Sequence, residues 1–162
     1  MPLPSTDFDP TESAVPWRFL MQHGHEFVFA TPDAKPAMAD QRMIDGNGLG
    51  LLRPFFIADK NGRSAYAEMS QSSEFLSPIA YDDIDIKSFD AILLPGGHAQ
   101  GMKPYLESKQ LQTLIARHFA AQKPIAAICH GVVLAARSLR GDGKSILHGF
   151  KTTALLQKQE ML

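Results

Sequence analysis

Two short apolar runs, each ending at a turn that contains glycine, constrain the fold of this chain most strongly. Residues 89–94 lead into Pro95-Gly96-Gly97-His98, and residues 124–128 lead into Cys129-His130-Gly131. A helical spacing of apolar residues separates the two runs, and another follows the second run. Strands that are apolar throughout are typical of parallel sheets covered by helices on both faces. The sequence therefore predicts an α/β fold with a mostly parallel sheet.

The rest of the chain supplies further helices and short strands. Asp9 or Thr11 is a candidate N-cap for a first helix that ends at Gly24. Residues 34–62 are rich in glycine and proline, but no strand precedes Gly46-Asn47-Gly48-Leu49-Gly50 and no Lys-Ser/Thr follows it. We interpret this segment as an ordered surface loop rather than a phosphate-binding loop. The other expected elements are a strand over 25–31, a helix over 63–76, a connector over 82–88, helices over 108–121 and 132–139, and strands over the two apolar runs.

Length and charge exclude several classes of protein. A chain of 162 residues fits a single domain, here residues 1–162. The net charge is −1, without the basic excess that is typical of nucleic-acid-binding proteins. The sequence lacks an apolar run of about eighteen residues, so we expect no membrane span, and its first residues do not resemble a signal peptide. The single cysteine has no partner for an intrachain disulfide. We expect a cytoplasmic protein with a reduced thiol.

The sequence around Cys129 is the strongest chemical signal. A strand enters Ala127-Ile128-Cys129-His130-Gly131 and a helix leaves it, which is the pattern of a nucleophile elbow with cysteine in place of serine. The turn requires small residues two positions before and after the nucleophile, and Ala127 and Gly131 fill them. A helix N-terminus beside the sulfur would favour thiolate, so we predict an accessible thiol with a low pKa. The alternative is a buried, inert cysteine.

The histidines have several possible roles. His130, next to the cysteine, is a candidate general base or a group that orients a substrate carbonyl. It can equally be a histidine that only forms a hydrogen bond at a helix start. The other histidines show no tight ligand spacing, so we predict no metal site and no cofactor. They are His23, His25, His98, His118 and His148.

Two further groups complete the candidate site. Gly96 and Gly97 follow the first apolar run and allow backbone N–H groups to point into a cavity. With the N–H of His130 they are candidates for an oxyanion hole, although a plain strand-ending turn gives the same pattern. Glu12 lies in the first turn of the first helix. A carboxylate there normally only compensates the helix dipole.

Taken together, these motifs resemble the ThiJ/PfpI superfamily of the class I glutamine amidotransferase-like fold, in its chaperone and glyoxalase III-like branch. The resemblance rests on Asp9-Pro10-Thr11-Glu12, on Gly24-His25-Glu26 with Ala30-Thr31-Pro32, on residues 90–98 and on residues 127–131. It implies a flavodoxin-like three-layer sandwich, commonly dimeric, in which Glu12 contacts Cys129. It also implies that both ends are shortened, with only Met1 to Ser5 left of the first strand. The third member of a triad falls near Gln157 or Glu160.

The resemblance implies a cysteine-dependent enzyme that acts on small molecules. The favoured reaction is the glutathione-independent conversion of methylglyoxal to lactate, or a related deglycase reaction. Cys129 would be the nucleophile, Glu12 would hold or exchange a proton, and His130 would act as base. The alternatives are a cysteine amidase or peptidase, and a non-catalytic chaperone or redox sensor. The expected partners are a small aldehyde and a second copy of the chain, without nucleic acid or membrane.

Overall fold

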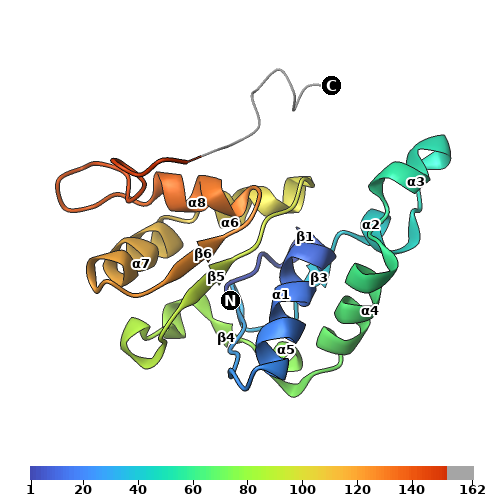
Figure 1. Ribbon diagram of the computed structural model, residues 1–162, viewed down its shortest axis with the longest axis horizontal. Coiled ribbons are helices and arrows are strands. Elements are labelled where there is room, and N and C mark those ends of the chain that lie inside the picture. The colour runs from blue at the N-terminus through green and yellow to red at the C-terminus, as the bar shows by residue number, and fades with distance from the viewer. Residues whose placement is uncertain (153–162) are drawn as a thin grey trace.

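Short parallel strands and the helices around them make up this protein (Figure 1). The structure is a computed structural model that describes residues 1–152, apart from the side chains of Leu52 and Phe55. The strands are β1 (Thr6–Phe8), β2 (Ala30–Thr31), β3 (Met38–Ala39), β4 (Ile79–Ala80), β5 (Ile92–Leu94) and β6 (Ile125–Ala127). The helices are α1 (Pro10–Gln22), α2 (Gln41–Asp45), α3 (Arg53–Phe56), α4 (Lys60–Met69), α5 (Ser73–Leu76), α6 (Lys103–Glu107), α7 (Lys109–Ala120) and α8 (Gly131–Arg137). Short 3₁₀ turns cover Gly50–Leu52, Tyr81–Asp83, Ile86–Ser88 and Gln100–Met102.

All three strand pairs are parallel, as the apolar runs predict. β1 pairs with β3, β2 with β4, and β5 with β6. An isolated bridge between Pro2 and Ala30 joins the N-terminal segment to β2, and the N–H of Leu3 donates to the carbonyl of Ala30 at 2.8 Å. Figure 1 shows α7 and α8 on one side of the β5–β6 pair and α1 and α4 on the other. The predicted α/β fold with a parallel sheet is therefore confirmed.

The first strand lies further along the chain than predicted. The strand β1 covers Thr6–Phe8 and pairs with β3, whereas Pro2 forms only an isolated bridge to Ala30 in β2. Residues 1–5, predicted to be the remnant of this strand, lie before β1. Leu3 and Phe8 are both fully buried, because the segment runs through the core rather than along the surface.

Three other predicted elements differ from the structure. The strand expected over 25–31 is reduced to β2. The segment 34–62, expected to be a loop, contains β3, α2 and α3 as well as the start of α4. The helix expected over 63–76 is divided into α4 and α5. Polar N-caps explain these helix starts, since the carboxylates of Asp40 and Asp59 and the hydroxyl of Ser72 each accept a backbone N–H at the beginning of a helix.

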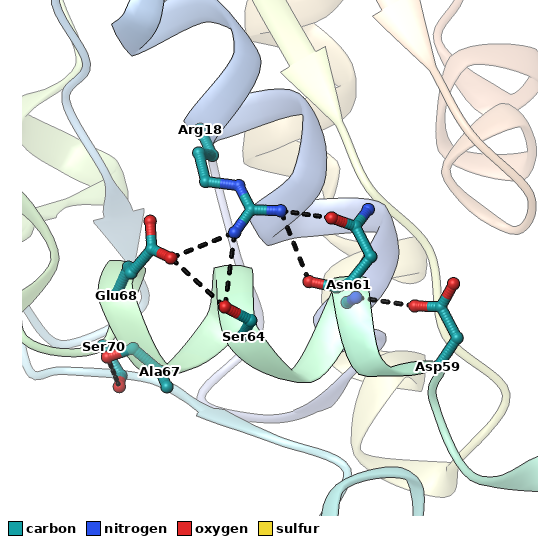
Figure 2. Close-up of polar contacts among 8 residues, drawn as sticks. Arg18, Asp59, Asn61, Ser64, Ala67, Glu68 and Ser70 are labelled. Atoms are coloured by element: carbon teal, nitrogen blue, oxygen red, sulfur yellow. Dashed lines mark hydrogen bonds and ion pairs between the residues drawn. The ribbon is translucent and has the colours of Figure 1, made fainter.

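Helix α1 is held against α4 by close packing and by a polar cluster. Arg18 forms an ion pair with Glu68 at 3.0 Å and also bonds to Ser64 and Asn61 (Figure 2). At the other end of the contact, a Cβ added to Gly62 would lie 2.3 Å from the Thr11 hydroxyl oxygen. This close approach fixes the first turn of α1, which carries Glu12. In the part of the chain that the structure describes, no helix is long and apolar enough to cross a membrane.

The turn after β6 packs closely against the end of β5. The N–H of Ile128 donates to the carbonyl of Leu94 at 2.9 Å. Gly131 begins α8 beside the same carbonyl, and a Cβ added there would lie 2.1 Å from the Leu94 oxygen. The small residue that the elbow motif requires at this position is therefore explained by the neighbouring strand.

This contact makes a prediction about stability. Gly131→Ala forces the turn away from β5, so the free energy of unfolding is expected to fall by about 1–3 kcal/mol, the usual cost of overpacking. Gly141→Ala is the matched control, since a Cβ at Gly141 meets nothing within 4 Å. Thermal and urea unfolding of the two variants check this. Equal stability of Gly131→Ala and Gly141→Ala would contradict it.

A second prediction concerns the outer edge of β6. Among residues 1–152, β6 pairs with β5 alone, and Ala126 in its middle is exposed. Exposed strand edges are templates for pairing with another chain. We therefore expect a dimer or larger assembly in sedimentation at micromolar protein concentration. A monomer under those conditions would contradict the expectation.

Candidate active site

Cys129 lies on the sharp turn between β6 and α8. Its φ angle is 50°, in the left-handed region that non-glycine residues rarely adopt. Such strain is typical of a nucleophile held at a strand-to-helix turn. Cys129 is exposed as a residue, although its thiol is partly buried among the neighbouring groups. The structure therefore places the cysteine in the elbow geometry that the sequence indicates.

Glu12 reaches this cysteine from the far end of the sequence. Asp9 caps α1 by accepting the N–H groups of Thr11 at 2.7 Å and Glu12 at 3.1 Å, and thereby orients the first turn. An Oε2 atom of Glu12 accepts the N–H of Gly96 at 2.9 Å. The Cys129 thiol donates a hydrogen bond to the same carboxylate. The contact between Glu12 and Cys129 that the resemblance implied is present.

Gly96 is required where these groups converge. A Cβ added to it would lie 2.8 Å from Glu12 Oε2 and 2.7 Å from the backbone nitrogen of His130. Its N–H is engaged by Glu12, which differs from the oxyanion role predicted for Gly96. The N–H of His130 is engaged as well, since it donates to the Cys129 sulfur. Gly96 therefore positions the carboxylate, and the oxyanion role of Gly97 and His130 stays a prediction.

The electrostatics of the pair differ from the sequence-based prediction. Burial raises the pKa of Glu12, and the nearby Asp9 carboxylate raises it further. Burial and the Glu12 carboxylate together raise the pKa of Cys129 to about 11. The N–H of His130 favours the thiolate but does not outweigh these effects. The predicted low pKa is therefore wrong, because burial and then the facing Glu12 carboxylate both disfavour the thiolate.

Two histidines flank the sulfur. The Nδ1 atom of His130 lies 3.4 Å from Sγ, and the Nε2 atom of His98 lies 4.0 Å from it. The two imidazole rings meet edge to face with centroids 5.0 Å apart. Sequence reasoning missed His98, although it follows the first apolar run by the same kind of turn that carries Cys129. Each of the three residues offers one metal-ligating atom, and these atoms lie within 4.8 Å of one another.

A small cavity opens beside these groups. It has a volume of about 290 Å³ and shares Gly97, His98 and His130 with the site. Its charged lining residues are Lys103, Glu107 and Arg137, and the last two form an ion pair at 4.0 Å. A separate hollow of about 360 Å³ between α7 and residues 139–141 includes none of the groups around Cys129. The third triad member was predicted at Gln157 or Glu160, and both lie outside the described residues.

Solved structures share the architecture of this chain. The Rapid Encystment Protein of 24 kDa from Francisella tularensis superposes with a TM-score of 0.67 at 19% identity, over 95% of this chain and 63% of that one. A ThiJ/PfpI domain protein from Brachyspira murdochii gives a TM-score of 0.60 at 15% identity, over 85% of this chain and 61% of that one. These likenesses show the fold, which is the predicted flavodoxin-like α/β sandwich.

Sequence comparison assigns the family. The family described as ThiJ/PfpI family-like matches residues 3–160, and this chain belongs to it. A curated but uncharacterized protein of Schizosaccharomyces pombe is 32% identical over 86% of this chain and 50% of its own length. A glutathione-independent glyoxalase of the same yeast is 27% identical, over 93% of this chain and 59% of its own length. A deglycase of Pyrococcus horikoshii is 26% identical, over 92% of this chain and 72% of its own length. The chain thus spans only half to three-fifths of the two yeast relatives.

The contact between Glu12 and Cys129 can be tested directly. Glu12→Gln removes the negative charge that disfavours thiolate, so the apparent pKa of Cys129 should fall from about 11 toward the ordinary value of about 8.5. The rate of iodoacetamide labelling of the folded protein, measured against pH, reports this value. Glu26→Gln, at an exposed glutamate, is the matched control and should label like the wild type. Identical profiles for the wild type and Glu12→Gln would contradict the assignment.

Proposed function

We propose that this chain is a cysteine-dependent, glutathione-independent glyoxalase that converts methylglyoxal to lactate. The observation that carries the proposal is the hydrogen bond from the Cys129 thiol to the Glu12 carboxylate, at an exposed elbow beside a small cavity. A thiol and a proton acceptor in contact are what addition to an aldehyde requires. The glutathione-independent glyoxalase among the yeast relatives supports the same activity.

The first step is addition of the thiol to the aldehyde carbon. Because the pKa of Cys129 is raised, the sulfur carries its proton at neutral pH and must lose it as it attacks. Glu12 takes that proton, and its own raised pKa makes it a stronger base than an ordinary carboxylate. The aldehyde oxygen becomes negative beside the N–H groups of Gly97 and His130, then regains the proton from Glu12. The product is a hemithioacetal.

The second step moves hydrogen within the substrate. His130 removes the proton from the former aldehyde carbon and returns it to the adjacent ketone carbon, while the hydroxyl proton on the first carbon passes to the ketone oxygen. The first carbon is thereby oxidised to a thioester while the second is reduced to an alcohol, so no external oxidant or cofactor takes part. Water then attacks the thioester carbonyl, the C–S bond breaks, and the thiol and lactate are released. The proton-transfer roles fall on the side chains of Glu12 and His130, and His130 Nδ1 lies 3.4 Å from the sulfur.

A deglycase activity is the second candidate. The archaeal relative is named a deglycase and matches 92% of this chain. The same thiol and carboxylate would act on an adduct derived from an aldehyde. A redox sensor is less favoured, because oxidation proceeds through the thiolate and the raised pKa of Cys129 keeps that form scarce.

Lactate formation from methylglyoxal is the decisive measurement. Cys129→Ser is expected to abolish turnover, because a serine hydroxyl next to a weak base does not add comparably to the aldehyde. His130→Ala is expected to lower turnover at least ~100-fold, the usual contribution of a positioned general base. His25→Ala, at an exposed histidine outside the cluster, is the matched control and should retain wild-type turnover.

The competing functions are separated in the same experiment. Release of free amine from a glycated substrate, run in parallel, distinguishes the deglycase from the glyoxalase. Suppression of aggregation of a second protein tests the chaperone alternative. A wild-type protein that forms no lactate, yet suppresses aggregation as well as Cys129→Ser and His130→Ala do, would overturn the enzymatic proposal.

A further inference from the structure

His98 takes no part in the proposed chemistry, yet it lies against the nucleophile. It is exposed, it follows β5, and its Nε2 atom lies 4.0 Å from the Cys129 sulfur. Its ring meets that of His130 edge to face. The turn after β5 and the turn after β6 therefore bring two imidazoles to one thiol, although His98 lies 31 positions before Cys129 in the sequence.

The spacing of these atoms suits a metal ion. Zinc binds sulfur at about 2.3 Å and imidazole nitrogen at about 2.0–2.1 Å, so neighbouring donors in a tetrahedral shell lie roughly 3.3–3.6 Å apart. The distance between Cys129 Sγ and His130 Nδ1 is already 3.4 Å, and that between Sγ and His98 Nε2 is 4.0 Å. All three ligand atoms lie within 4.8 Å of one another.

The surroundings favour a cation. The carboxylates of Glu12 and Asp9 both lie close enough to His98 for an attractive Coulombic interaction with its imidazolium form. Asp9 is buried, with 5% of its surface exposed, and Glu12 contacts the sulfur. Positive charge placed between His98 and Cys129 therefore faces two carboxylates at short range.

We propose that His98, Cys129 and His130 form a binding site for zinc, and that zinc bound there blocks the thiol. Thiolate with two imidazoles is a donor set that zinc accepts, and three protein ligands leave one position for water. As the S–Zn bond forms, the thiol releases its proton to the solvent and both imidazoles bind as neutral ligands. The sulfur lone pair is then shared with the metal and cannot attack an aldehyde. Binding follows from the geometry alone, whereas the inhibition rests on the proposed glyoxalase function.

The test measures binding separately from turnover. Cobalt(II), added to the purified protein under reducing conditions, should give the near-ultraviolet sulfur-to-cobalt charge-transfer band with one equivalent bound, and zinc should displace it. Equilibrium competition with a zinc-binding dye then gives the zinc affinity. His98→Ala should weaken zinc binding at least about 100-fold, since even outer-sphere changes cost 10–100-fold. His25→Ala should bind zinc as the wild type does. Stoichiometric zinc should also slow alkylation of Cys129 and stop lactate formation, and a chelator should restore both.

The outcomes separate this inference from the proposed function. If the wild type forms lactate but shows no charge-transfer band, or if His98→Ala binds zinc as well as the wild type does, the zinc site is refuted and the glyoxalase proposal is unaffected. If the wild type shows the band, His98→Ala does not, and no lactate forms, the zinc site is supported and the glyoxalase proposal is refuted. Zinc bound in the wild type without slower alkylation of Cys129 would overturn the claim that the metal blocks the thiol.

Discussion

The candidate site depends on the close approach of two backbone turns. The turn after β5 and the turn after β6 pack so tightly that a Cβ on Gly131 would lie 2.1 Å from the Leu94 oxygen. Likewise, a Cβ on Gly96 would lie 2.7 Å from the backbone nitrogen of His130. Because neither turn has room for a side chain at these points, the parallel pairing of β5 with β6 places the groups they carry in one small volume.

The N-terminal segment completes that arrangement. Strand β1 leads directly into α1, with Asp9 as the single residue between them and as the helix cap. The N–H of Asp9 donates to the carbonyl of Gly96 at 2.9 Å, and the N–H of Gly96 donates to Glu12 at the same distance. Two hydrogen bonds thus connect the start of α1 to the turn after β5. Glu12 faces the sulfur because its helix is fixed at both its cap and its carboxylate.

The electrostatics give the thiol a particular resting state. A nucleophile at the end of a strand with a helix behind it ordinarily gains thiolate character. Here burial of the thiol, together with the facing Glu12 carboxylate, reverses that tendency, and the pKa of Cys129 rises to about 11. The sulfur carries the proton and donates it in a hydrogen bond to Glu12. The sulfur loses this proton only when it bonds to an electrophile or a metal ion. Both the proposed glyoxalase reaction and the proposed zinc site begin from this protonated pair.

The sequence by itself determined the parallel α/β class, the strand-to-helix elbow at Cys129 and the need for a small residue at Gly131, because these follow from local apolar runs and turn residues. It also identified the first turn of α1, since Asp9, Pro10 and Glu12 are adjacent there. Only the tertiary structure decided that segment 34–62 forms short helices, that the N–H of Gly96 binds the Glu12 carboxylate, and that His98 lies beside the sulfur. It also decided that the pKa of Cys129 is raised rather than lowered. These properties arise from atoms far apart in the chain, and burial and through-space charge have no signature in any short stretch of sequence.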